Sequence, residues 1–212
     1  MIPNALRKGD TIGVIAPSDS IDIDDNKYIQ KSSKLFEDLG FKIKLSEFVS
    51  SNSLGYSASP LEKAQDVNSM FANPDVKAIF IVKGGENSNT TFEYLNYELI
   101  TNNPKILCGF SDSTSITNII SSKTGLVTFS GATFKSLTSW ETDYAFKEVV
   151  KRFIDKNSDL GTPDDKFETL QHGIATGKLI GGNLSLTSQL VCGKYTLDFT
   201  DKILFIEELG FE

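Results

Sequence analysis

Short apolar runs alternate along the chain with longer segments in which apolar residues recur at helical spacing. The apolar runs predict strands, most of them buried on both faces, at residues 11–16, 41–45, 78–82, 105–108, 127–130, 175–180 and 203–206. The helical spacing predicts helices at residues 25–39, 59–73, 91–99, 113–120 and 144–154, with a short one ending at 190. Strands that alternate with helices are typical of a mainly parallel sheet covered by helices. The pattern therefore predicts an α/β fold.

The predicted helix at residues 59–73 has the clearest start signal. Ser59 can cap the helix, Pro60 fits its first turn, and the side chain of Glu62 can accept a hydrogen bond from the backbone N–H of the capping residue. We therefore expect this helix to begin at Pro60.

A polar stretch divides the chain into three parts. Residues 1–155 form the predicted N-terminal α/β domain, residues 156–172 a linker, and residues 173–212 the beginning of a second domain. A segment as short as the last one rarely closes a core of its own. We expect it either to pack on the first domain or to be part of a larger, incomplete second domain.

Composition and charge narrow the classes of partner. The formal net charge of −7 argues against nucleic acid or an anionic membrane as the main partner. No apolar run approaches the roughly 20 residues that span a bilayer, and the start of the chain lacks the apolar core of a signal peptide. Cys108 and Cys192 lie in apolar contexts without metal-ligand spacing, so we expect both in the core, with a disulfide or redox role as the alternative. The sequence predicts a cytoplasmic protein with no metal and no cofactor.

The stretch Gly109–Asp112 is the most informative part of the chain. It joins an apolar strand to a helix whose first turn is rich in hydroxyl groups. A serine on such a turn exposes its oxygen, and the free amides of the helix N-terminus can stabilise an oxyanion. Ser111 is therefore a candidate nucleophile, although the second glycine of the Gly-x-Ser-x-Gly signature is missing. The alternative is an ordinary turn or capping serine.

A second candidate loop follows the strand at residues 78–82. Gly84 and Gly85 allow the backbone to approach a ligand closely and to offer an amide to an oxyanion. In an open parallel sheet this loop and the Ser111 turn lie on the edge where such folds bind ligands. Asn87, Ser88 and Asn89 would continue the rim and bind a polar substrate. The alternatives are a simple turn and a solvated loop.

Acidic residues and the single histidine give the remaining candidates. Glu207 ends the last apolar strand and could orient a catalytic imidazole, or it could be one of an exposed acidic pair. We expect His172 to be a solvated loop residue. Asp112 is expected to contribute its backbone amide rather than to act as a base. The aspartates at residues 22–25 and 164–165 are expected to be solvated loop and helix-cap charges. They lack the spacing of a calcium-binding loop.

Five segments, in this order, resemble the LD-carboxypeptidase family of serine peptidases, which includes murein tetrapeptide carboxypeptidases and microcin C immunity peptidases. The segments are Gly9–Ser18, Lys83–Gly85, Gly109–Asp112, Gly181–Leu184 and Ile203–Glu207. The resemblance implies a flavodoxin-like first domain. It also implies that Ser111 is the nucleophile and Glu207 the carboxylate of a Ser-Glu-His triad, with the amides of Gly85 and Asp112 as the oxyanion hole. The implied substrate is a small peptide or peptide-like molecule with a free carboxylate, and a homodimer is possible.

The chain departs from the family pattern at the triad histidine. In the family this histidine lies well downstream of the glutamate, whereas here the chain ends at Glu212 and His172 precedes Glu207. We therefore expect these 212 residues to lack the general base and to be inactive as they stand. Residues 84–89 and 103–106 look closer to the microcin-immunity branch, but the segment 144–177 is short for that branch. A general carboxypeptidase is the expectation.

Two other functions remain open on the residues alone. The same loops could hold a peptide or an amino-acid derivative without turnover, as a non-catalytic binding module. A nucleotide-phosphate site at Gly84–Gly85 has less support, because neither a Gly-x-Gly-x-x-Gly nor a Walker pattern follows.

Overall fold

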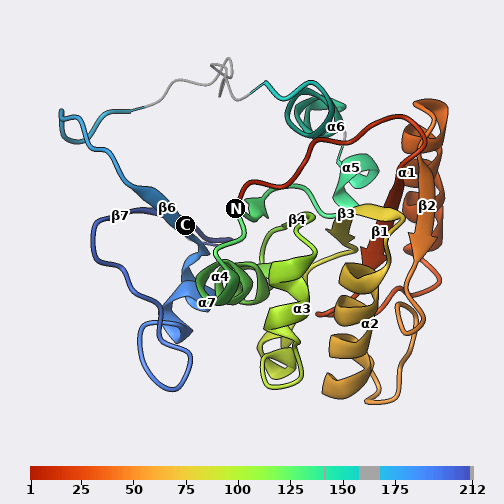
Figure 1. Cartoon of the computed structure of the whole chain (residues 1–212), viewed down its shortest axis with the longest axis horizontal. Helices are drawn as coiled ribbons and strands as arrows, with labels where there is room; N and C mark the ends of the chain where they lie inside the picture. The colour runs from red at the N-terminus through yellow and green to blue at the C-terminus, as the bar shows by residue number, and fades with distance from the viewer. Residues whose placement is uncertain (141, 158–167, 211–212) are drawn as a thin grey trace.

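The computed structural model describes residues 1–140, 142–157 and 168–210. Its centre is a five-stranded sheet (Figure 1) in which every neighbouring pair of strands is parallel. The strands are β1 (Thr11–Ile15), β2 (Lys42–Leu45), β3 (Val76–Ile81), β4 (Ile106–Gly109) and β5 (Phe129–Ser130). Their order, β2-β1-β3-β4-β5, is the flavodoxin-like order, in which ligands bind at the carboxyl ends of β1 and β3. The predicted α/β fold is confirmed.

Helices cover both faces of this sheet, and strand side chains alternate between them. One face packs against α1 (Asn26–Asp38), α5 (Ser136–Ser139) and α6 (Tyr144–Val149). The other face packs against α2 (Pro60–Ala72), α3 (Tyr97–Asn102) and α4 (Ser113–Thr124). Phe80 of β3 belongs to the first core, where it meets the rings of Phe36 and Phe134. Ile81, its neighbour in β3, belongs to the second core. This burial on both faces explains the continuous apolar runs.

The start of α2 is the predicted capping box. The Ser59 backbone N–H donates to Glu62 Oε2 at 2.7 Å, and the Glu62 N–H donates to Ser59 Oγ at 3.4 Å. Two amides that have no partner inside the helix are thereby satisfied.

Two helices differ from their predictions. The single helix expected at residues 91–99 is replaced by a 3₁₀ turn, η1 (Ser88–Thr91), and by α3, which starts six residues later. The later start has a local cause, because Asn96 caps α3 by accepting a hydrogen bond from the Leu99 N–H at 2.9 Å. The helix expected at residues 144–154 ends in a π-helical turn, η2 (Val150–Ile154).

The C-terminal segment forms a small unit of its own, with β6 (Lys178–Asn183), α7 (Leu184–Gln189) and β7 (Lys202–Glu207). β6 begins three residues later than predicted and pairs in parallel with β7. Helix α7 packs against α4, and Leu190 and Leu197 join the second core. The segment thus packs on the first domain, which was one of the two arrangements expected from the sequence. Of the predicted linker, residues 158–167 lie outside the described residues.

The two cysteines have different environments. Cys108 is buried in β4, as predicted, whereas Cys192 is exposed and the prediction of a core position is wrong. The chain fills the core at Leu190 and turns outward after it, which carries Cys192 to the surface. In the part of the chain that the structure describes, no helix has the length and apolarity needed to cross a membrane.

Ser59→Ala is expected to lower the free energy of unfolding by about 1 kcal/mol, because it removes the oxygen that caps α2. Urea denaturation measures the change. Ser69→Ala, a substitution inside the same helix, is the control and is expected to cost less. Equal losses in the two variants would contradict the capping role of Ser59.

Candidate active site

The candidate site lies where the loops after β1, β3 and β4 leave the same edge of the sheet. This edge includes the carboxyl ends of β1 and β3, where the order of strand addition reverses. The structure therefore brings the predicted residues of the 84–89 loop and of the Ser111 turn to one place.

Ser111 occupies a strained strand-to-helix turn between β4 and α4. Its φ of +64° is in the left-handed region, which costs a non-glycine residue on the order of 1 kcal/mol or more. A Cβ built on Gly84 would lie 3.0 Å from Ser111 Oγ, so the glycine lets the loop backbone approach the hydroxyl closely. This is the geometry expected of a nucleophile turn.

Two backbone amides beside Ser111 have no acceptor. The N–H groups of Gly85 and Asp112 make no hydrogen bond with any other group among the described residues. Gly85 has a φ of +139°, a conformation that side chains of other residues rarely allow. Such free amides can donate to an oxyanion.

The side chain of Asp112 has a role that the sequence did not reveal. The carboxylate is 2% exposed and accepts hydrogen bonds from Ser18 Oγ at 2.5 Å and from the Ser88 N–H at 2.9 Å. The backbone carbonyl of Asp112 accepts a further hydrogen bond from Ser88 Oγ at 2.7 Å. Ser18 follows β1, Ser88 follows β3, and Asp112 itself follows β4. The hydrogen bonds of Asp112 therefore join three loops next to Ser111.

A buried lysine interacts with the charge of Asp112. Lys63 on α2 is 2% exposed, and its Nζ lies 5.9 Å from the centre of the Tyr56 ring. Burial lowers the pKa of Lys63, while the charges of Asp112 and Asp19 oppose that shift. Burial also raises the pKa of Asp112, against the hydrogen bonds from Ser18 and Ser88. The opposite charges of Lys63 and Asp112 therefore compensate each other in the interior.

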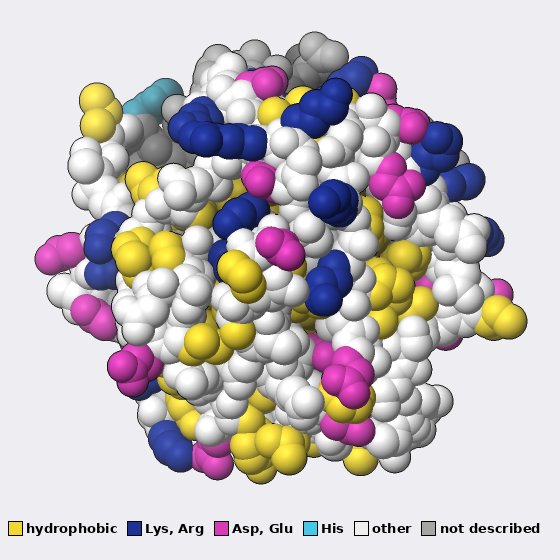
Figure 2. All heavy atoms as spheres, turned by 45° about the vertical axis from the view of Figure 1, so that its right-hand side comes forward, with side chains coloured by type: hydrophobic (Ala, Val, Ile, Leu, Met, Phe, Trp, Pro, Cys, Tyr) yellow, Lys and Arg dark blue, Asp and Glu magenta, His cyan; other side chains and the backbone are white. Residues whose placement is uncertain are grey.

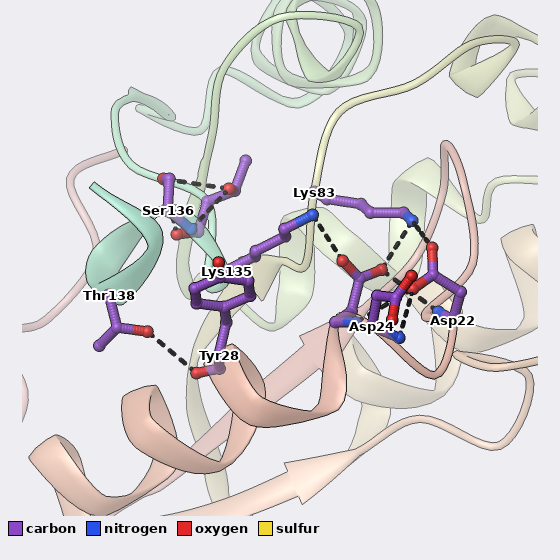
Figure 3. A network of polar contacts seen from close by, with 9 residues as sticks. Asp22, Asp24, Tyr28, Lys83, Lys135, Ser136 and Thr138 are labelled. Carbon is purple, nitrogen blue, oxygen red and sulfur yellow. Dashed lines mark hydrogen bonds and ion pairs between the residues drawn. The ribbon is translucent and has the colours of Figure 1, made fainter. Parts of the chain in front are cut away.

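A second charged network holds the other end of the 84–87 loop (Figure 3). Asp25 is 1% exposed and pairs with Lys83 Nζ at 2.7 Å and Lys135 Nζ at 2.5 Å, and Lys83 also pairs with Asp22 at 3.1 Å. Burial alone would raise the pKa of Asp25, but the bonds from Lys135 and Lys83 outweigh it and lower the pKa to about 2. The expectation that Asp25 is solvated is therefore wrong, because two lysines from distant loops enclose it.

The residues predicted for the rim divide into two groups. Asn87 donates to Tyr56 Oη at 3.1 Å, and Asn89 is exposed and lines a cavity of about 160 Å³ together with Phe92 and Ser115. Ser88 is fully buried, so it supports the loop from below instead of facing the rim as predicted.

Glu207 reaches the same region from the C-terminal unit. It is the last residue of β7 and pairs with Asn183 of β6, whose N–H donates to Thr114 Oγ1 in the first turn of α4 at 3.0 Å. Glu207 Oε1 is buried and has no hydrogen-bond partner among the described residues. Its neighbour Glu208 accepts from Asn183 Nδ2 at 2.8 Å and from the Ser185 N–H at 3.0 Å, and so fixes the start of α7. The sequence singled out Glu207 as a candidate carboxylate but did not reveal the capping role of Glu208.

No imidazole approaches Ser111 within the described part of the chain, where His172 is exposed in the segment before β6. Across those same residues, no group of three or more His, Cys, Asp and Glu side chains is placed to hold a metal ion.

Asp112→Asn is expected to lower the free energy of unfolding by about 2–3 kcal/mol. Ser18 and Ser88 both donate to Oδ2 of Asp112, and the substitution removes the negative charge that strengthens these two bonds. It also leaves Lys63 without its buried counter-charge. Urea denaturation measures the loss, and Asp75→Asn, at an exposed carboxylate, is the control with an expected change within about 0.5 kcal/mol. A loss no larger than that of the control would contradict the tethering role of Asp112.

Asp25 is expected to make stability depend on pH in strongly acidic solution. Its pKa is lowered from 3.8 to about 2, so the unfolded chain binds more protons than the folded one between these values. The stabilisation is complete above pH 3.8 and is lost as the pH falls toward 2. Wild-type stability, measured by denaturation across this range, should fall more steeply than that of Asp25→Asn. Parallel slopes would show that Asp25 does not cause the dependence.

The comparisons with known proteins agree with this geometry. The model of the LD-carboxypeptidase N-terminal domain matches residues 12–131, and that of the LD-carboxypeptidase C-terminal domain matches residues 176–212. The putative carboxypeptidase YocD of Bacillus subtilis is 32% identical, over 98% of this chain and 70% of its own length. The probable murein peptide carboxypeptidase of the same organism is 33% identical, over 99% of this chain and 66% of its own length.

The fold similarity is equally extensive. The crystal structure of an MccF-like protein from Bacillus anthracis has a TM-score of 0.86 and 33% identity, and the match covers 98% of this chain and 70% of that one. The chain thus spans about two thirds of the length of the relatives it matches. With both family models matched and the strand-end loops assembled at one edge, the chain belongs to the LD-carboxypeptidase family.

Proposed function

We propose that this chain is the part of a serine carboxypeptidase that contains the nucleophile, and that the enzyme hydrolyses an amide bond next to a terminal carboxylate. The observation that carries the proposal is Ser111, held in a left-handed turn against Gly84, with the free amides of Gly85 and Asp112 beside it. A hydroxyl and two unpaired amides at one strand-end edge are the parts that acyl transfer requires.

In the proposed reaction Ser111 Oγ attacks the carbonyl carbon of the scissile amide. The amides of Gly85 and Asp112 stabilise the negative charge that develops on the carbonyl oxygen. The C–N bond then breaks, the serine proton passes to the leaving amino group through an imidazole, and water hydrolyses the acyl-serine ester.

Glu207 is the proposed carboxylate that orients this imidazole. Its buried Oε1 has no donor among the described residues, and a buried acceptor without a partner is costly. An imidazole N–H would satisfy it. We propose that the imidazole comes from outside these 212 residues, since His172 is exposed in the segment before β6.

The residues proposed to contact the substrate lie on the same edge of the sheet as Ser111. Gly84, Asn87 and Asn89 would contact a small peptide-like substrate, while Ser88 supports them. On the face in Figure 2, basic and acidic side chains are interspersed, without the continuous basic surface typical of nucleic-acid binding. The cytoplasmic location, the possible homodimer and the domain bounds 1–155 and 173–212 stay predictions.

A non-catalytic binding module is the second candidate. The observation that favours it is the lack of an imidazole near Ser111 in the described part of the chain. Peptide turnover by these 212 residues is accordingly expected to be low, because without the base only about 10³-fold catalysis over water remains.

Labelling with a serine-directed fluorophosphonate separates the two candidates. We expect one adduct, at Ser111 by peptide mapping, that forms faster when imidazole is added, and less acceleration in Glu207→Gln. Ser111→Ala should give no adduct, and Ser121→Ala, which changes a serine in the last turn of α4, should label like the wild type. Peptide binding without any Ser111 adduct, with or without imidazole, would favour the binding module and contradict the peptidase.

A further inference from the structure

Asp19 lies beside the loop that contains the proposed oxyanion hole. A Cβ built on Gly85 would lie 2.2 Å from the Asp19 carboxylate, so this carboxylate occupies the space next to Gly85 that a side chain would fill. Asp19 Oδ1 also accepts a hydrogen bond from the Glu86 N–H at 3.3 Å. Because Ser111 Oγ lies against the preceding residue, Gly84, the carboxylate and the nucleophile border successive residues of one loop.

The charge of Asp19 is not neutralised by its surroundings. Asp19 forms no salt bridge within the described ranges, and the two lysines at the neighbouring loop ends are engaged by Asp22 and Asp25. Lys63 is the remaining positive charge nearby, and its electrostatic partners are both Asp112 and Asp19. Two carboxylates around one ammonium leave one negative charge without a counter-charge.

That charge has a consequence for chemistry at Gly85. A carboxylate next to an oxyanion hole opposes the negative charge that develops there in the transition state, and the opposition is stronger in a half-buried site than in bulk water. A positive group on the ligand would neutralise the charge of Asp19 and so remove this opposition. Asp19 can bind such a group, since a carboxylate has about four acceptor positions and one backbone N–H uses only one of them.

We infer that Asp19 is a specificity residue that binds an ammonium group of the substrate close to the scissile bond. The inference rests on the proposed function and deepens it: the favoured substrates are peptides in which the residue that supplies the scissile carbonyl has an unblocked amino group. Peptides with that group acylated lose the pairing and leave Asp19 opposed to the oxyanion.

The test measures binding of two probes to the full chain by isothermal titration, with Ser111→Ala in every protein so that no peptide is hydrolysed. The probes are L-lysyl-D-alanine and its Nα,Nε-diacetyl derivative. We expect the unblocked peptide to bind about five- to tenfold more tightly than the diacetyl peptide. Asp19→Asn, which keeps the size of the side chain, should reduce this preference to about twofold or less.

Asp24→Asn is the matched control, because it removes an exposed carboxylate from the same loop and should retain the full preference. The inference is overturned if Asp19→Asn retains it, if the parent protein shows none, or if the unblocked peptide does not bind. None of these results decides whether the fluorophosphonate labels Ser111, which tests the proposed function separately. Conversely, a preference that depends on Asp19, together with no Ser111 adduct, would support this inference and contradict the peptidase.

Discussion

The carboxylate of Asp112 is the constraint on which the rest of the site depends. Three loops meet at it, because it accepts from Ser18 after β1 and from Ser88 after β3 while it is itself part of the turn after β4. A buried carboxylate is costly unless it is hydrogen-bonded and compensated, and Lys63 lies near enough to interact with its charge. The strained conformation of Ser111 persists because its neighbour is held on both sides in this way.

Asp25 performs the corresponding task at the other end of the glycine loop. Lys83 comes just before Gly84 and is held by Asp25, while Ser88 comes just after Asn87 and is held by Asp112. The four residues between these two anchors contain the flexible glycines, and Glu86 and Asn87 add hydrogen bonds to Asp19 and Tyr56. The half-buried Asp19 adds a charge beside a loop whose ends are already held.

The sequence predicted the fold where local pattern and burial agree. Apolar runs identified the strands, and the position of Ser111 and Gly84 after two such runs was enough to place both on one edge. The buried charges were missed, because a carboxylate before a helix, such as Asp25, has the same local sequence whether solvent or two lysines surround it. Lys63 did leave a signal: it lies one turn from Val67 on the buried face of α2, where a lysine is out of place.

The two anchors of the glycine loop respond differently to acid. Burial raises the pKa of Asp112. The pKa of Asp25, by contrast, is lowered to about 2 by its bonds to Lys135 and Lys83. On acidification Asp112 therefore takes up a proton first, and the loop loses the charge-assisted bond at Ser88 while Lys83 remains paired. The far end of the loop is then held by uncharged partners, through the Ser88 hydroxyl on the Asp112 carbonyl and through Asn87 on Tyr56, so acid weakens one end of the glycine loop before the other.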